Sequence, residues 1–402
     1  MSSNTESYSR EELVNDHILT RLPVKSLLRY KRVCKSWRDL ITSSSFIKKH
    51  LDNESTGTRK IVAKFGVDYD TEPLPTRQFH IYLLPDKIFA GTVPTHQRTF
   101  YIDGVSDFRD IHGPMNGIFL LEKGHFMDNI RFAWWNPATK QIRLIPKFEF
   151  ELKETFNDCC RMLGMGYDKT TQDYKIISFR TFWDEWTTNL HPKIFAALYS
   201  TKHDSWKYLE PNYSHECQIS VTQNFTYKDG LYHWMASSQV ICDQDNVFRV
   251  LTFDFATELF GEMPGPPIPG NSWTTLMLRG GSLATMASNE VAKPMIATYD
   301  IWQRIRENNW IKVYTLNPPI PWHWPNGMWE YDKYIFELTE TYRLVFYDQS
   351  AKQATNLGFD FFQRLQSGWA WPLNYKESLF PIPLRSENPT EQDNIEYFFG
   401  KF

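Results

Sequence analysis

The chain has 402 residues, of which 42% are hydrophobic and 23% are charged, and this composition excludes an intrinsically disordered protein. No stretch approaches the roughly 18 apolar residues of a membrane span, so we expect no membrane partner. The net charge of −3 is unevenly distributed: residues 21–50 carry nine basic side chains and one acid, whereas residues 51–402 have a net charge of −8. The two parts are therefore expected to differ in partner.

The cysteines and the N-terminal residues indicate the compartment. No C-x-x-C pair occurs and the number of cysteines is odd, which favours reduced thiols in an intracellular protein. Residues 1–12 are polar and contain no apolar signal segment. We therefore expect a cytoplasmic protein, with the nucleus as a second location.

The apolar spacing between residues 12 and 51 predicts a small helical module. One apolar stripe lies opposite the basic residues and consists of Tyr30, Val33, Cys34, Trp37, Leu40 and Ile41. A preceding helix is expected to stop before Pro23, and Ser45 is expected to cap the last turn. So short a module cannot bury all these side chains by itself, and the surplus apolar face is predicted either to dock a partner or to pack on the rest of the chain.

The segment Ile18–Ile41, with the sequence ILTRLPVKSLLRYKRVCKSWRDLI, closely resembles the F-box of plant proteins. The resemblance implies an F-box over residues 8–52 that binds a Skp-type adaptor and, through it, the cullin and RING subunits of a ubiquitin ligase. The adaptor-binding residues that it implies are Leu13, Ile18, Leu22, Pro23, Leu27, Leu28, Val33, Trp37, Leu40 and Ile41. Arg10 and Glu11 replace the usual Leu-Pro, and Asp16 stands where an apolar residue is common, so a weaker grip by the first helix is expected.

The basic face of this module has a second interpretation as a nucleic-acid-binding surface. It lacks interleaved aromatic residues and a recognisable reading helix. Basic residues opposite an apolar stripe are usually a solvated helix face, so we expect no nucleic-acid partner.

Residues 53–402 are expected to form a mainly β domain, because short apolar runs are separated by Gly, Pro, Asn and Asp. Examples of such runs are Lys60–Phe65, Phe79–Leu84 and Tyr174–Phe179. An aromatic strand, a polar turn and a second strand recur, at intervals of 64, 54 and 94 residues, around Asn136, Ser200, Asp254 and Asp348. The last interval is double and contains Asn309–Tyr314. A period near 50 residues predicts the blades of a kelch-type β-propeller, with a β-sandwich as the alternative.

Several segments of this domain resemble the F-box-associated domain: Asp110–Gly117, Asn136–Thr139, Leu163–Asp168, Asp173–Lys175, Trp310–Tyr314 and Tyr375–Leu379. Together with Tyr299–Trp302, they are most similar to S-locus F-box proteins of gametophytic self-incompatibility. The resemblance implies a receptor in pollen or the pollen tube that binds non-self S-ribonucleases and directs their ubiquitination. Met115 departs from the commoner Cys of this family.

No pattern indicates catalysis or a metal site. The segment Gly164–Asp168 lacks the third glycine of a phosphate-binding loop, and His233 is expected to be a packed or half-exposed ring in a strand, not a catalytic base. The adjacent Asp184 and Glu185 diverge in an extended chain, unlike the facing carboxylates of a glycosidase. We therefore expect no catalytic residue, no cofactor and no metal.

These observations predict the substrate-recognition subunit of a ubiquitin ligase. Its acidic domain suits a basic protein substrate such as an S-ribonuclease. The sequence does not identify the substrate-binding residues, and the candidate contact loops are Asp184–Trp186, Asp243–Asn246 and Trp322–Trp329. The alternatives are an F-box receptor for another endogenous client and a β-propeller binding protein, lectin or enzyme outside any ligase.

Overall fold

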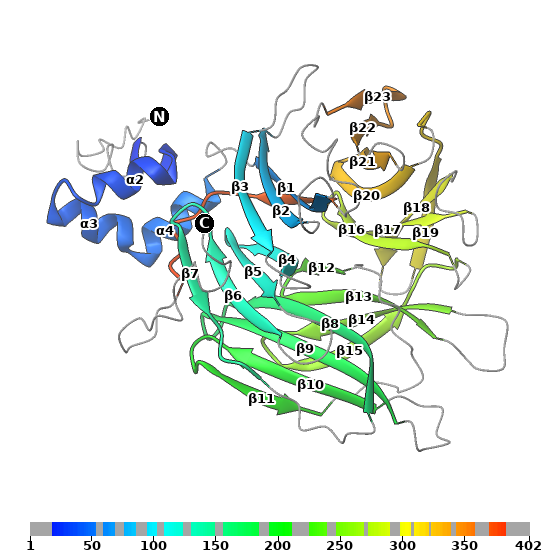
Figure 1. Ribbon diagram of the computed structural model, residues 1–402, viewed down its shortest axis with the longest axis horizontal. Coiled ribbons are helices and arrows are strands. Elements are labelled where there is room, and N and C mark those ends of the chain that lie inside the picture. The colour runs from blue at the N-terminus through cyan, green and yellow to red at the C-terminus, as the bar shows by residue number, and fades with distance from the viewer. Residues whose placement is uncertain are drawn as a thin grey trace, which may run out of the picture.

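The computed structural model describes residues 18–53, 59–68, 76–85, 95–102, 108–123, 130–148, 156–184, 193–210, 225–238, 247–268, 272–289, 298–306, 309–320, 323–338, 343–357 and 370–382. A helical N-terminal module lies beside a ring of β-sheets (Figure 1), which confirms the predicted fold class. Within the described ranges, no helix is long and apolar enough to cross a membrane.

In the described part of the helical module, a 3-10 turn precedes three α-helices. They are η2 (Leu19–Arg21), α2 (Val24–Tyr30), α3 (Lys35–Thr42) and α4 (Ser44–Asp52). The apolar stripe predicted as one face therefore crosses from α2 to α3 through the turn 31–34, because its spacing continues across the break. The cap predicted at Ser45 is wrong. Ser43, directly after α3, accepts a hydrogen bond from the Phe46 backbone N–H (3.3 Å) and begins α4 two residues earlier.

The described strands form six four-stranded antiparallel sheets, here called blades 1 to 6. Blade 1 contains β24 (Ala370–Tyr375), β1 (Arg59–Asp68), β2 (Thr76–Pro85) and β3 (Thr95–Ile102); blade 2 contains β4 (Phe108–Met115), β5 (Ile118–Lys123), β6 (Arg131–Asn136) and β7 (Gln141–Leu144). Blade 3 contains β8 (Phe156–Asp168), β9 (Asp173–Asp184), β10 (Lys193–Ser200) and β11 (Ser205–Leu209); blade 4 contains β12 (Phe225–Lys228), β13 (Leu231–Ser238), β14 (Val247–Asp254) and β15 (Leu259–Pro264). Blade 5 contains β16 (Thr274–Arg279), β17 (Ser282–Ser288), β18 (Tyr299–Arg306) and β19 (Asn309–Leu316); blade 6 contains β20 (His323–Glu330), β21 (Lys333–Leu338), β22 (Leu344–Asp348) and β23 (Gln353–Asn356).

The ring is closed by strands from opposite ends of the domain. β24 pairs with β1 from Arg59↔Tyr375 to Lys64↔Ala370, so blade 1 joins the last strand to the first three. Neighbouring blades contact each other through β24 and β4, β4 and β8, β8 and β13, β12 and β16, β16 and β20, and β20 and β24. A closed ring of sheets is a propeller, which decides against the β-sandwich.

The recurring turn residues mark the same place in four blades. Asn136, Ser200, Asp254 and Asp348 each end the third strand of their blade, and blade 5 fills the double interval. The side-chain Oδ1 of Asp254 accepts hydrogen bonds from the backbone N–H groups two and three residues on (2.8 and 3.2 Å), and Asn136 and Asp348 do the same. This turn satisfies backbone donors at the strand end, which explains why Asn or Asp recurs there.

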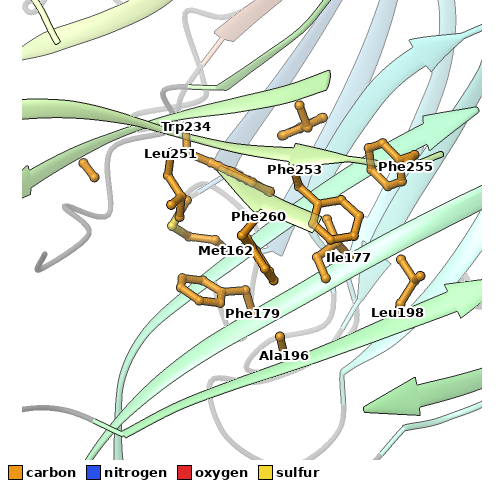
Figure 2. Packing of buried hydrophobic residues seen from close by; sticks show 12 residues of the cluster. Met162, Ile177, Phe179, Ala196, Leu198, Trp234, Leu251, Phe253, Phe255 and Phe260 are labelled. Carbon is orange, nitrogen blue, oxygen red and sulfur yellow. The ribbon is translucent and has the colours of Figure 1, made fainter. Parts of the chain in front are cut away.

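Adjacent blades pack face to face through aromatic and aliphatic side chains. Figure 2 shows this packing between blades 3 and 4, where Phe179 from β9 and Phe253 and Phe255 from blade 4 lie in one buried cluster. A Cβ at Gly166 of β8 would overlap the Phe255 ring. The glycines of the segment Gly164–Asp168 therefore admit the next blade and do not form a phosphate-binding loop.

Two tryptophans of the repeat also join neighbouring blades. Trp206 of β11 donates its indole N–H to the Pro146 carbonyl of the preceding blade (2.7 Å), and Trp310 of β19 donates to the Pro264 carbonyl (3.0 Å). Both prolines directly follow or end the fourth strand of the preceding blade. In these two blades, a Trp in the fourth strand therefore forms a hydrogen bond to a Pro carbonyl of the preceding blade.

Candidate functional site

The helical module exposes apolar side chains that its own fold does not cover. Ile18, just before η2, is 53% exposed; Tyr30 of α2 is 36% exposed, and Val33 of the α2–α3 turn is 63% exposed. The Tyr30 ring packs edge-on against Trp37 (5.3 Å between ring centroids). Exposed apolar groups gathered on a module of this size indicate a surface for a protein partner.

The ten residues predicted to bind the adaptor fall into distinct environments. Leu27 and Ile41 are fully buried in the module, whereas Leu22, Leu28, Trp37 and Leu40 are half-buried and Pro23, Ile18 and Val33 are exposed. Leu13 lies outside the described residues. The prediction omits Tyr30, although its place in the apolar stripe was visible in the sequence.

Exposed basic side chains lie on the same elements, α2, the α2–α3 turn and α3. Arg29, Arg32, Lys35 and Arg38 are exposed, and Asp39 is the one acid in residues 21–50. Lys31 is half-buried, and this burial lowers the pKa of its ammonium group. A partner for this surface is therefore expected to present acidic groups around an apolar centre.

The module's interior holds these groups in place. Cys34 caps α3 by accepting a hydrogen bond from the Trp37 backbone N–H (3.4 Å), which fixes where α3 begins. His50 of α4 is 1% exposed, and its Nε2 lies 2.9 Å from the Leu22 carbonyl. Burial is the main cause that lowers the pKa of His50, so the neutral ring ties α4 to the extended residue before Pro23.

The surplus apolar face divides into two parts: packing on the rest of the chain is confirmed for one part, and docking of a partner stays a prediction for the other. Leu19, Val24, Leu27, Ile41, Phe46 and Ile47 form a buried cluster with Leu379, a residue beyond β24. Ile18, Tyr30 and Val33 remain exposed. One part of the face packs on the rest of the chain, and the other is available to a partner.

Some charged residues of the propeller join neighbouring blades. Lys175 of β9 donates to Asp168 (3.0 Å) in its own blade and to Glu258 (3.0 Å) and the Phe255 carbonyl (2.8 Å) of blade 4. Although burial alone would raise it, the hydrogen bonds from Thr171 and Lys175 hold the pKa of Asp168 well below its usual range.

A similar group joins blades 5 and 6. Arg279 makes two hydrogen bonds to Asp332 (2.8 and 3.1 Å) and one to Gln303 (2.6 Å). Its guanidinium also lies over the Tyr331 ring, 4.1 Å from the centroid. Through these contacts the charged side chains of Arg279 and Asp332 link blade 5 to blade 6.

His233, the histidine that the sequence analysis singled out, can be placed in the structure, and the absence of an active site stays a prediction. His233 is 3% exposed in β13, and burial lowers its pKa to about 4, which fits a packed neutral ring. Among the residues that the structure describes, no group of three or more His, Cys, Asp or Glu could hold a metal ion.

The predicted contact loops are only partly testable. Residues 185–186 and 243–246 lie outside the described residues. The prediction of a third loop is wrong for residues 323–329. They form most of strand β20 at the inner edge of blade 6, and Trp329 is only 2% exposed.

Comparison with known proteins agrees with both parts of the structure. Residues 15–49 match the F-box domain, and residues 108–382, more than half of the chain, match the F-box associated beta propeller domain. An F-box/kelch-repeat protein of Arabidopsis thaliana is 26% identical over 65% of this chain and 67% of its own length. A putative F-box protein of the same plant is 27% identical over 69% and 67%. An F-box/LRR-repeat protein of that plant is 23% identical over 93% and 83%.

The match extends the resemblance of single segments to the continuous stretch from β4 to the residues after β24, that is, to the propeller without β1–β3 of blade 1. It says nothing of an S-locus role, since the relatives are named only for their F-box and repeats. The chain belongs to the family of plant F-box proteins that carry an F-box associated beta propeller domain.

Proposed function

We propose that this protein is the substrate receptor of an SCF-type ubiquitin ligase. Its F-box binds a Skp-type adaptor, which brings the cullin and RING subunits, and its propeller holds a protein client. The observation that carries the proposal is the exposed apolar surface of Ile18, Tyr30 and Val33 within the segment that matches the F-box domain.

The receptor works by positioning. Holding a client beside a ubiquitin-charged conjugating enzyme raises the effective concentration of the client's lysines. In this proposal the transfer itself is left to the conjugating enzyme, and no side chain of this chain takes part in it. The half-exposed and exposed members of the predicted set make the contact, whereas Leu27 and Ile41, which are 0% exposed, support it from inside.

Adaptor binding by Val33→Asp tests this surface. Val33 is 63% exposed, so the change should leave the fold intact while placing a charge in the apolar contact. We expect a loss of about 2 kcal/mol, roughly thirtyfold in Kd, by calorimetric titration with a purified Skp-type adaptor. Leu259→Asp, at a propeller site that is 57% exposed, is the matched control and should bind like wild type. Equal binding by both variants would refute the placement of the site.

The client that we propose is a basic S-ribonuclease, bound in the cytoplasm of pollen or the pollen tube. The support is the resemblance of Asp110–Gly117 and Tyr299–Trp302 to S-locus F-box proteins and the net charge of −8 over residues 51–402. An endogenous client of another kind is the rival. Electrostatic steering predicts that the association rate with a basic S-ribonuclease falls steeply between 50 and 300 mM salt, on the order of tenfold. An association rate that does not change with salt concentration would show that electrostatic attraction does not guide this client to the propeller.

A further inference from the structure

The seven residues after β24, Lys376–Ile382, connect the propeller to the helical module; we call them the strap. Figure 1 shows the orange-red chain of β24 leading from the ring of sheets to the helices. At one point of the strap, Leu379 (3% exposed) completes the buried cluster of the F-box. Three residues later, Ile382 (1% exposed) lies in the core between blades 2 and 3. The strap therefore belongs to both hydrophobic cores.

One buried amide holds the strap to blade 2. Asn136, which is 0% exposed, donates from Nδ2 to the carbonyls of Ser378 (3.0 Å) and Phe380 (2.9 Å). Its Oδ1 meanwhile caps the β6–β7 turn, as Asp254 and Asp348 do in their blades. A carboxylate can cap the turn but cannot donate, so only an amide serves both purposes. This explains why blade 2 has Asn at the position where blades 4 and 6 have Asp.

Polar contacts and close packing fix the start of the strap. Lys376 donates from Nζ to the carbonyl of Asn53 at the end of α4 (2.8 Å), and Asn53 in turn donates to the Thr20 carbonyl (3.3 Å) in η2. On the other side, a Cβ at Gly117 would lie 2.7 Å from the Lys376 carbonyl and against Ser378. Gly117 also has a positive φ of 77° in the β4–β5 turn. The strap has no room to shift at this point.

From these contacts we infer that the strap makes the F-box depend on the propeller: the F-box core is stable only while Leu379 is docked. The module alone is too small to bury its apolar residues, and the strap supplies the missing member from the far end of the chain. Since β24 also closes the ring, closure of the propeller and folding of the F-box are coupled through one segment. A consequence, which rests on the proposed function, is that Leu379 sets adaptor affinity without touching the adaptor.

Two isomeric truncations in the full-length chain separate this inference from general destabilisation. Leu379→Ala removes a side chain from the F-box cluster, and Ile382→Ala removes one of equal size from the cluster between blades 2 and 3. Amide hydrogen exchange should quicken at least about tenfold in α2 and α4 for Leu379→Ala, with blades 3 and 4 unchanged. Ile382→Ala should act first on β6 and β8. Unchanged exchange in α2 and α4 for Leu379→Ala, or the same pattern in both variants, would overturn the inference.

Asn136→Asp provides a second route if Leu379→Ala does not fold. It keeps the turn cap but replaces the two donated hydrogen bonds with a carboxylate facing two carbonyls, so α4 should again exchange faster by about tenfold. Asp348→Asn, the reverse change in the equivalent turn of blade 6, should leave α4 unaffected. Equal α4 exchange in the two variants would contradict the role of Asn136.

Adaptor binding distinguishes this inference from the proposed function. Leu379→Ala should weaken binding of a Skp-type adaptor about tenfold relative to Ile382→Ala. If wild type fails to bind the adaptor, the proposed function fails, while the exchange pattern still decides the coupling. If wild type binds and Leu379→Ala binds equally well, the claimed effect on the adaptor site is wrong.

Discussion

Gly166→Ala is the substitution for which the structure gives the sharpest expectation. Gly166 lies in β8, and a Cβ placed there would come closer than 3.0 Å to three atoms of the Phe255 ring. Phe255 is 0% exposed and packs edge-on against Phe253, with 5.1 Å between ring centroids. Its carbonyl also accepts a hydrogen bond from Lys175. The ring therefore has little freedom to withdraw.

The size of the effect follows from this overlap. To reach ordinary contact, the ring would have to move by about 1 Å or more, in an interior where loss of fit forfeits many dispersion contacts at once. Overpacking typically costs about 1–3 kcal/mol, and lower entropy of the unfolded chain returns only about 0.4–1 kcal/mol for Gly→Ala. Because the overlap is with a fixed ring, we expect a net destabilisation in the upper part of the resulting range, about 2 kcal/mol.

Guanidinium denaturation of the full-length chain measures this change as a lower midpoint. Gly261→Ala in β15 is the matched control, because its Cβ would meet one atom, the Thr252 hydroxyl at 2.8 Å, and not three atoms of a ring, and it should cost less than Gly166→Ala. In the double variant with Phe255→Ala, the new methyl enters the space left by the ring. The double variant should therefore be less destabilised, by about 2 kcal/mol, than the sum of the destabilisations of the two single variants. Strict additivity would refute the packing argument.

Three further predictions concern buried polar and aromatic groups. The pKa of His233 is lowered to about 4 by burial, so the unfolded chain takes up a proton near pH 6.5 that the folded chain does not. The free energy of unfolding should therefore fall by about 2 kcal/mol between pH 7 and pH 5. In His233→Gln this loss should be absent when the denaturation midpoints at the two pH values are compared. Arg279→Lys cannot make both hydrogen bonds to Asp332 and should cost about 1–3 kcal/mol in the same assay, whereas an unchanged midpoint would mean that the link between blades 5 and 6 is dispensable. Trp37→Ala should lose about 2 kcal/mol of stability, less than a fully buried Trp, because its ring is half-buried against Tyr30; thermal unfolding that matches wild type would show that this contact is idle.

Local features of the fold were predictable from the sequence. The turn residues Asn136, Asp254 and Asp348 revealed the third strand of three blades because their side chains cap the turn that they begin. The F-box was predictable because its residues form one long, specific string. Helical spacing hid the break at 31–34, since apolar residues keep the same period on both sides of the turn.

Long-range features were not predictable. The pairing of β24 with β1 joins residues about 310 positions apart, and neither strand carries a local sign of the other. For the same reason, nothing in the sequence around Leu379 indicates that it belongs to the F-box core. Within the candidate site, the sequence identified the apolar positions but could not separate buried Leu27 and Ile41 from exposed Ile18 and Val33, because all four have the same chemical character.

Binding of the wild-type, full-length chain to a purified plant Skp-type adaptor tests the central claim most directly. Calorimetry would measure the Kd and the stoichiometry for the adaptor, and co-elution would show whether the cullin joins the complex. A receptor subunit should form a one-to-one complex with a Kd on the order of 1 μM or tighter and carry the adaptor-bound cullin with it. A folded chain that shows no binding would contradict the ligase role, and the departures at Arg10, Glu11 and Asp16 would then mark an F-box that no longer docks.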